Sequence, residues 1–228
     1  MRVVTYNVRG FRDGRDRVAD VVRRLEPDVL LLQETGARRH LRRFAEGVGM
    51  RVGRDPWSPL RRRVKNAVLL AEPWRFTSIE LERFATARRW YPRGALVARI
   101  TSGAEVVWAV AVHFGLGGAE RSAQAASLMD LARGLDGGLV IVGGDLNATP
   151  DMRAVVRIAH DLRDAWSHAG QGEGATFPAF APVARIDYVF VGHPVTIVRA
   201  IVGAEGSTDA SDHLPVAVDL RPADGPMP

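Results

Sequence analysis

The chain has 228 residues, a length that suits one large domain, and 46% of them are hydrophobic, which is enough for a sizeable core. Because cysteine is absent, disulfides and thiolate metal sites are excluded, and any metal must be held by oxygen or imidazole. That donor set favours Mg²⁺ or Mn²⁺ over a structural zinc.

The formal charge is +5, and Lys65 is the only lysine among 31 basic residues. Arginine pairs well with phosphate oxygens, so a polyanionic substrate is compatible with this charge, although GC-rich coding also produces arginine in place of lysine.

No apolar stretch approaches the roughly 18 uninterrupted residues that a membrane helix needs. The first predicted strand begins at Arg2, which leaves no room ahead of it for a signal peptide. If the chain is complete, we therefore expect a monomeric cytoplasmic protein without membrane insertion.

Apolar runs alternate with amphipathic segments along the chain. The predicted strands are Arg2–Tyr6, Asp28–Gln33, Ala67–Ala71, Ala95–Ile100, Val106–Val112, Leu139–Val142, Tyr188–Val191, Val195–Val202 and Leu214–Leu220. The predicted helices are Arg15–Leu25, Arg38–Val48, Glu120–Leu135 and Met152–Ala159. Residues 67–112 contain strands without a helix between them and should be antiparallel, because parallel strands need a long crossover. The mixture predicts sheet packed on sheet with helices outside.

Two segments are predicted as surface loops. Arg51–Lys65 carries prolines and five arginines, and His168–Ala184 is rich in glycine and proline. The second loop directly precedes Arg185-Ile186-Asp187, so we expect it to overhang the functional site. Neither G-x-G-x-x-G nor G-x-x-x-x-G-K-[ST] occurs, so dinucleotide binding and P-loop chemistry have no local support. One domain is expected over residues 1–221, followed by a disordered tail at 222–228.

Polar groups stand at the ends of several apolar runs, where α/β scaffolds gather catalytic side chains. The segments are Thr5-Tyr6-Asn7, Leu32-Gln33-Glu34, Gly143-Gly144-Asp145-Leu146-Asn147, Arg185-Ile186-Asp187-Tyr188 and Ser211-Asp212-His213-Leu214-Pro215. Carboxylate and amide oxygens together with a histidine suit a hard-oxygen metal site with an acid/base group. The pattern predicts hydrolysis of phosphate esters.

Each segment also has a simpler interpretation. Glu34 must be paired, ligate a metal or emerge at the strand end, because burying a bare carboxylate is unfavourable, and an exposed strand-end glutamate is the alternative. Asp145 and Asn147 share one face of an extended backbone, so one could orient water while the other binds a phosphate oxygen. Alternatively, this segment is a turn with Asx hydrogen bonds.

The histidines extend the pattern. Asp212-His213 alone is usually a surface dipeptide, but Asp187 could hold His213 in one tautomer and stabilise its imidazolium, as in catalytic triads. His113 ends the predicted strand Val106–Val112 and supplies a second imidazole at a strand terminus.

In this order, the segments resemble the endonuclease/exonuclease/phosphatase superfamily, which includes pancreatic deoxyribonuclease, abasic-site endonucleases, neutral sphingomyelinases and inositol polyphosphate phosphatases. The resemblance runs from Thr5-Tyr6-Asn7 to Ser211-Asp212-His213 and so covers nearly the whole chain. Further markers agree, namely Asn66-Ala67-Val68-Leu69-Leu70, Arg93-Gly94-Ala95-Leu96 and Ala119-Glu120-Arg121 with Gln124.

The resemblance implies a four-layer α/β/β/α sandwich, with two mixed, mostly antiparallel sheets face to face and helices outside. It implies a Mg²⁺ or Mn²⁺ site at one rim, with Glu34 as the principal ligand and Asn7 and Asp212 as direct or water-mediated ligands.

The resemblance also assigns catalytic roles to five residues. Asp145 would activate or orient the attacking water, Asn147 would bind a phosphate oxygen, His213 held by Asp187 would contact the scissile phosphate, and His113 would support the developing charge or the leaving group. Arg93 and Asn66 would join Asn147 in binding substrate.

One departure disfavours an abasic-site endonuclease. Val112-His113-Phe114-Gly115 matches the branch with histidine, and the tyrosine-containing segment of abasic-site enzymes is absent between His113 and Gln124. The leading hypothesis is therefore a Mg²⁺- or Mn²⁺-dependent phosphodiesterase acting on nucleic acid, DNA or RNA, or on nucleotides, which the charge and the Arg51–Lys65 loop favour. The alternatives are a phosphoesterase of a small phosphorylated metabolite or lipid headgroup, and a degenerate, non-catalytic phosphate-binding module.

Overall fold

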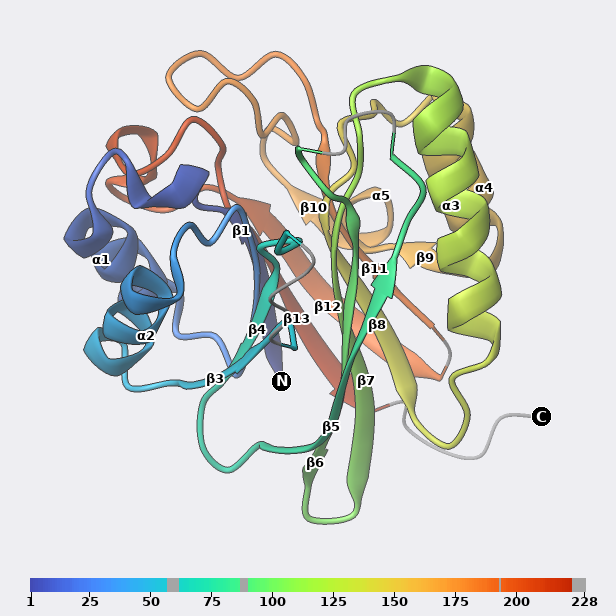
Figure 1. Ribbon diagram of the computed structural model, residues 1–228, viewed down its shortest axis with the longest axis horizontal. Coiled ribbons are helices and arrows are strands. Elements are labelled where there is room, and N and C mark those ends of the chain that lie inside the picture. Colours follow the sequence, from blue (N-terminus) through green and yellow to red (C-terminus); the bar gives the residue numbers. More distant parts are fainter. Residues whose placement is uncertain (57–61, 87–89, 193, 223–228) are drawn as a thin grey trace.

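Two β-sheets lie face to face, with helices on both outer surfaces (Figure 1). The computed structural model describes residues 1–56, 62–86, 90–192 and 194–222. Most of the predicted disordered tail, residues 223–228, lies outside the described residues, and Pro222 ends the last strand. The arrangement is the four-layer α/β/β/α sandwich that the sequence predicts. No helix among the described residues is long and apolar enough to cross a membrane.

The first sheet has seven strands in the order β10-β12-β13-β1-β2-β4-β3. Their bounds are β1 Arg2–Asn7, β2 Val29–Gln33, β3 Arg51–Arg54, β4 Ala67–Leu70, β10 Gly170–Gln171, β12 Val195–Val202 and β13 Val216–Pro222. β1 pairs in parallel with β2, as β10 does with β12, and the other neighbours are antiparallel. The sheet is therefore mixed but mostly antiparallel.

The second sheet has six strands in the order β5-β6-β7-β8-β11-β9. Their bounds are β5 Arg75–Arg83, β6 Gly94–Ser102, β7 Glu105–His113, β8 Leu139–Asp145, β9 Arg163–Asp164 and β11 Asp187–Val191. Only the β7/β8 pair is parallel among these neighbours. The predicted antiparallel stretch at residues 67–112 is confirmed, but it divides between the sheets, because β4 belongs to the first and β5, β6 and β7 to the second.

None of the four edge strands was predicted, and β9 and β10 have only two residues each. β3 lies inside the predicted Arg51–Lys65 loop, and it is a four-residue edge strand with a glycine at its third position. The loop prediction is wrong for these four residues, and residues 57–61 lie outside the described chain. β5 alternates charged and apolar residues and is half exposed, so its short apolar signal was too weak to indicate a strand.

Two pairs of helices cover the outer faces. α1 (Arg15–Leu25) and α2 (Arg38–Gly47) lie on the first sheet, and α3 (Gly118–Arg133) and α4 (Arg153–Asp161) lie on the second, with a short helix α5 (Ala165–Ala169) before β10 (Figure 1). Three apolar clusters fill the three interfaces, one between the sheets and one under each helix pair. The long helices begin and end within two residues of their predicted bounds.

Strand alternation explains why polar groups meet at one end of the inter-sheet core. Val3 and Leu31 point into that core, and Val4 and Leu30 point toward α1 and α2. Asn7 therefore falls on the inter-sheet face, at the end where β1 stops. Gly143 lets the sheets approach closely here, because a Cβ on it would lie 2.6 Å from Leu31 and 3.3 Å from Thr5.

Asn66, just before β4, connects the two sheets beneath this end. Its side chain is fully buried, and its amide donates to the carbonyl oxygens of Gly94 and Ala111 at 2.9 Å each. It lines neither of the cavities at the site among the described residues. We therefore propose a structural role for Asn66 in place of the expected substrate contact, because both amide hydrogens are committed to the opposite sheet.

We expect Asn66→Ala to lower the free energy of unfolding by about 2–4 kcal/mol, because two buried hydrogen bonds are lost from a side chain that cannot be solvated. Denaturant unfolding measures this loss. The Michaelis constant for bis-p-nitrophenyl phosphate should not change at a temperature where the variant is folded. A raised Michaelis constant with native stability would return Asn66 to the substrate site.

Candidate active site

Backbone register brings three polar strand ends to Asp145. His113 at the end of β7 is paired with Asp145 at the end of parallel β8, and Asp187 at the start of antiparallel β11 is paired with Asp145 from the other side. In the opposite sheet, Asn7 ends β1 beside Gln33 of β2. The polar groups therefore occupy adjacent strand ends at one rim of the sandwich, as predicted from their place after apolar runs.

The carboxylate of Asp145 is the centre of the hydrogen-bond network. Its Oδ2 accepts from Nδ2 of Asn7 at 3.0 Å and lies 3.3 Å from Nε2 of His113 and 3.8 Å from Nε2 of His213. Its Oδ1 accepts from the backbone N–H of Asn147 at 2.8 Å. Burial alone would raise the pKa of Asp145, but the two histidines and this N–H hold it well below its usual range. Asp145 is therefore an ionised acceptor with polar partners from both sheets.

His213 and Asp187 form a buried pair. Nδ1 of His213 lies 2.9 Å from Oδ2 of Asp187, which also accepts from the Thr176 hydroxyl at 2.6 Å. Burial alone would lower the pKa of His213, but the charge and hydrogen bond of Asp187 raise it to about 10. The pKa of Asp187 is raised by burial despite this partner, and the charge of Asp145 adds to the effect. Nε2 of His213 is left facing Asp145.

The loop prediction for His168–Ala184 is wrong for its first four residues, which belong to α5 and β10, and the remainder of this segment packs against the pair. The Phe177 ring lies 4.9 Å from the His213 ring, and the backbone N–H of Ala179 donates to the carbonyl of Asp212 at 2.8 Å. Thr176, which the sequence did not single out, accepts from the N–H groups of Ile186 and Asp187 as well. The loop therefore holds the imidazole in place from the solvent side.

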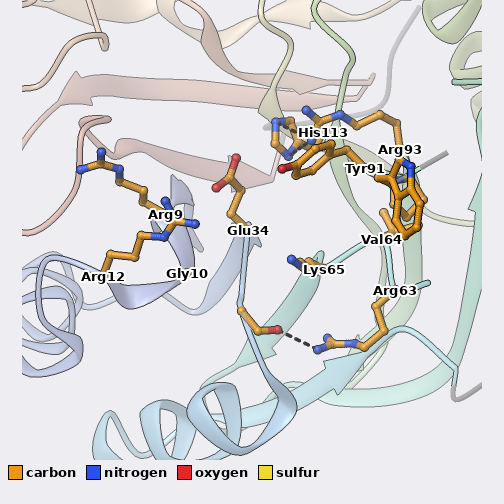
Figure 2. Close-up of a pocket in the computed structure, with 13 residues that line it drawn as sticks. Arg9, Gly10, Arg12, Glu34, Arg63, Val64, Lys65, Tyr91, Arg93 and His113 are labelled. Atoms are coloured by element: carbon orange, nitrogen blue, oxygen red, sulfur yellow. Dashed lines mark hydrogen bonds between the residues drawn. The ribbon is translucent and has the colours of Figure 1, made fainter. Parts of the chain in front are cut away.

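Glu34 lies apart from this network, in an open cavity of about 220 Å³. Its carboxylate makes no hydrogen bond or ion pair with any residue in the described ranges, although arginines stand on both sides of it (Figure 2). A second cavity, of about 500 Å³, shares Glu34, Tyr91 and Arg93 with the first and extends toward Leu116. Glu34 thus borders both cavities with an unpaired negative charge.

Arg9 connects the other two predicted metal ligands. Its Nε lies 3.1 Å from Oδ2 of Asp212, and its backbone N–H donates to Oδ1 of Asn7 at 3.1 Å. The charge of Asp212, with a smaller effect of Glu34, raises the pKa of Arg9. Arg9 therefore contacts Asp212 through its guanidinium and Asn7 through its backbone, and it lies within electrostatic reach of Glu34. No sequence pattern singles out Arg9, because its importance depends on its neighbours in space.

Arg93 and Asn147 are the remaining residues predicted to bind substrate at the site. Nη1 of Arg93 lies 2.8 Å from Nδ1 and 3.0 Å from Nε2 of His113, and Arg93 lines both cavities. Burial lowers its pKa, which the charges of Asp145 and Glu34 oppose. Asn147 donates one amide hydrogen to the carbonyl of Phe114 at 3.0 Å, which leaves its second hydrogen for another acceptor.

Backbone strain is concentrated at this rim. Among the described residues, six non-glycine positions have a positive φ, and one of them, Glu26, caps helix α1. The others belong to segments of the site, and they are Arg9 (45°), Phe11 (61°), Glu34 (53°), Lys65 (63°) and Asn147 (48°). Left-handed backbone is unfavourable for residues with a Cβ and is retained mainly where a site requires it.

Two packed, mixed sheets with acidic, amide and imidazole groups meeting at one rim define the class of this protein as a phosphoesterase of the deoxyribonuclease I-like fold. Residues 4–213 match the model of the Endonuclease/Exonuclease/phosphatase family. The chain belongs to this family, whose members generally depend on a divalent metal.

Solved structures of similar fold cover nearly the whole chain. An endonuclease/exonuclease/phosphatase from Bacteroides vulgatus is 21% identical with a TM-score of 0.83, covering 97% of this chain and 98% of that one. Humanized D. rerio TDP2 is 19% identical with a TM-score of 0.79, covering 97% and 98%. The mannosyl-6-phosphatase Bt3783 of Bacteroides thetaiotaomicron is 18% identical with a TM-score of 0.77, covering 97% and 99%. These similarities establish the fold, and no curated protein matches the sequence.

Proposed function

We propose that the chain is a divalent-metal-dependent phosphodiesterase that hydrolyses nucleic acid or nucleotides by attack of water. The observation that carries this proposal is the unpaired carboxylate of Glu34 in a cavity that is otherwise lined by five cationic side chains. Those side chains are Arg9, Arg12, Arg63, Lys65 and Arg93. A cavity of this charge favours an anionic ligand, and its single free carboxylate favours a metal beside that ligand.

Glu34 fits a metal ligand better than the other acidic cluster does. Asp145, Asp187 and His213 also have potential ligand atoms within 4.8 Å of one another. These groups are buried, and Nδ1 of His213 is already bonded to Oδ2 of Asp187 at 2.9 Å, although Oδ1 of Asp187 has no hydrogen-bond partner. At Glu34, no such bond is lost, and oxygens of Asn7 and Asp212 lie nearby around Arg9.

A divalent cation held there would polarise a phosphoryl oxygen and acidify a bound water. The protein's own groups account for the remaining chemistry. The ionised carboxylate of Asp145 can accept a proton from the attacking water or orient it, and the second amide hydrogen of Asn147 can bind a phosphoryl oxygen. Both groups are fixed by neighbours, so they need not reorganise as charge develops.

The two histidines would stabilise negative charge from opposite sides of Asp145. His213, held through Nδ1 by Asp187, directs Nε2 toward the substrate side and can carry a positive charge. His113 and the adjacent guanidinium of Arg93 can support the leaving oxygen. The retention of all these groups disfavours a degenerate binding module.

A phosphatase of a small phosphorylated metabolite or lipid headgroup is the alternative. The cavity of about 220 Å³ favours it, because a small phosphate monoester would fill such a space. A similar fold is also found in a protein described as a mannosyl-6-phosphatase. The five cationic side chains that line the cavity favour a polyanionic substrate such as nucleic acid instead.

Hydrolysis rates measured with Mn²⁺ at several salt concentrations separate the two functions. A single-stranded oligonucleotide should be hydrolysed, with an apparent affinity that falls steeply with salt, by a slope of roughly 0.7 per phosphate contact. Mannose 6-phosphate and bis-p-nitrophenyl phosphate serve as small comparison substrates. Faster turnover of the sugar phosphate, with little salt dependence, would favour the metabolite phosphatase.

We expect Glu34→Gln to weaken Mn²⁺ binding and to lower kcat, each by on the order of 100-fold, because the substitution removes the ligand charge and keeps the shape. Isothermal titration and steady-state kinetics measure the two losses. Glu80→Gln, the same change on an exposed residue of β5, is the matched control. Native metal affinity in Glu34→Gln would exclude Glu34 as the principal ligand.

For His213 and Asp187 we expect coupled losses. If Asp187 acts through His213, the double variant His213→Ala/Asp187→Ala should lose little more activity than His213→Ala alone, because residues acting as a unit are not additive. Rates at saturating substrate for both single variants and the double variant complete the cycle. Fully additive free energies of activation would mean that Asp187 and His213 act independently.

A further inference from the structure

The cavity beside Glu34 contains more positive charge than its own neighbours neutralise. Three of its five cations already have partners, namely Arg9 with Asp212, Arg63 with Asp55, and Arg93 with His113. The side chains of Arg12 and Lys65 make no hydrogen bond or ion pair within the part of the chain that the structure describes. Both are exposed and both line this cavity.

Arg12 and Lys65 are presented by segments that are bonded to the backbone around Glu34. The N–H of Gly10 donates to the carbonyl of Glu34 at 2.7 Å, which fixes the turn that leads to Arg12. The N–H and hydroxyl of Thr35 donate to the carbonyl of Lys65 at 2.9 and 3.0 Å. Figure 2 shows the two side chains on opposite sides of Glu34, both directed toward it. These backbone hydrogen bonds therefore place both side chains at one cavity.

A phosphate group relieves the mutual repulsion of these two cations. Guanidinium offers paired N–H donors that match phosphate oxygens, and an ammonium acts as an adaptable point charge. Glu34, Arg93 and His113 line this cavity, whereas Asp145, His213 and Asn147 do not, so the cavity adjoins the metal-binding side of the catalytic site. The phosphate under attack must reach Asp145 and Asn147, so a phosphate between the exposed side chains of Arg12 and Lys65 would be the neighbouring one.

Two exposed aromatic side chains form another wall of the same cavity. Trp90 is 69% exposed and Tyr91 is 60% exposed, and the guanidinium of Arg62 lies 4.2 Å from the centre of the Trp90 ring. Exposed rings beside a cationic groove suit unpaired nucleic-acid bases, because every base can stack on an aromatic face. A volume of about 220 Å³ can hold either a small phosphate monoester or part of one nucleotide of a longer substrate, so the exposed rings and not the volume favour the nucleotide.

We propose that this cavity binds the nucleotide next to the scissile phosphate of a single-stranded nucleic acid, with its phosphate between Arg12 and Lys65 and its base against Trp90 and Tyr91. This inference rests on the proposed function and specifies its substrate as a chain with at least two phosphates. Arg12 and Lys65 are positioning residues, since in this proposal they contact the neighbouring phosphate and not the phosphate under attack.

The first test compares binding of two hydrolysis-resistant phosphorothioates, the thymidine dinucleotide TpT and the trinucleotide TpTpT. The second phosphate should tighten binding to the native chain by roughly tenfold. In Arg12→Gln/Lys65→Asn this gain should fall severalfold, to what stacking of the added base supplies, and asparagine suits the left-handed backbone at position 65. Arg43→Gln/Arg75→Gln, at two exposed arginines that line neither cavity, makes the same charge change and should keep the gain. A full gain in Arg12→Gln/Lys65→Asn would overturn the proposal.

The second test uses the unique lysine. Lys65 carries the only side-chain amine, so acylation followed by peptide mass spectrometry reports on this cavity, with the amine of Met1 as internal reference. TpTpT should slow acylation of Lys65 by roughly fivefold or more without changing that of Met1, because the bound phosphate covers the ammonium. Mannose 6-phosphate at the same concentration should protect Lys65 much less. Equal protection by both would overturn the proposal.

The two tests separate failure of the subsite from failure of the proposed function, because neither requires turnover. If Lys65 is protected by TpTpT but no unmodified oligonucleotide is hydrolysed, the subsite stands and the nuclease activity is wrong. If oligonucleotides are hydrolysed while Lys65 reacts at its native rate, the nuclease activity stands and the subsite is overturned.

Discussion

The rim of this sandwich depends on one buried negative charge, the carboxylate of Asp145. An ionised carboxylate is tolerated in such a place only when hydrogen bonds and positive groups surround it. Asn7 and His213, which adjoin strands of the first sheet, and His113 and Asn147, which adjoin strands of the second, supply those partners. The same contacts that make burial of Asp145 possible therefore bring the strand ends of both sheets together.

Around this centre, charge is distributed unevenly. The histidine–aspartate pair is covered by the loop that carries Phe177 and Thr176, and its polar groups are almost all satisfied. Glu34 and the cations near it face open cavities and are less completely paired. The buried part of the rim is thus rigid and suited to proton transfer, and the open part is suited to ligands that bring their own charge. Left-handed backbone at Glu34 and Lys65 directs side chains into that open part.

The layers of the fold and most of the site segments were predictable from the sequence, because they depend on local periodicity. Leu30 packs in the core under α1 and α2, and Leu31 packs in the core between the sheets. A strand that is buried on both faces therefore has a continuous apolar sequence, which is easy to recognise. The register of β7, β8 and β11 was not predictable, yet it is what places His113 and Asp187 on either side of Asp145. Short edge strands such as β3 leave too few residues for a pattern to emerge.

The roles of some site residues depend on groups that lie opposite them in space, which the sequence does not show. Asn66 belongs to a segment that resembles the family's pattern, but its amide is bonded to the carbonyls of Gly94 and Ala111, 28 and 45 residues away. Arg9, Arg12 and Lys65 have no sequence signal of their own in a chain with 31 basic residues. Their position follows from hydrogen bonds to the backbone of Glu34 and Thr35, and the sequence does not encode such contacts locally.

The central claim is that the free carboxylate of Glu34, and not the buried Asp145–Asp187–His213 cluster, anchors the metal. Anomalous diffraction from crystals soaked in Mn²⁺ tests it most directly, because the anomalous signal locates the ion without reference to activity. The account predicts the principal peak next to the Glu34 carboxylate, with the hydrogen bond between Nδ1 of His213 and Asp187 intact. A principal peak among Asp145, Asp187 and His213, with that hydrogen bond broken and no density at Glu34, would contradict it.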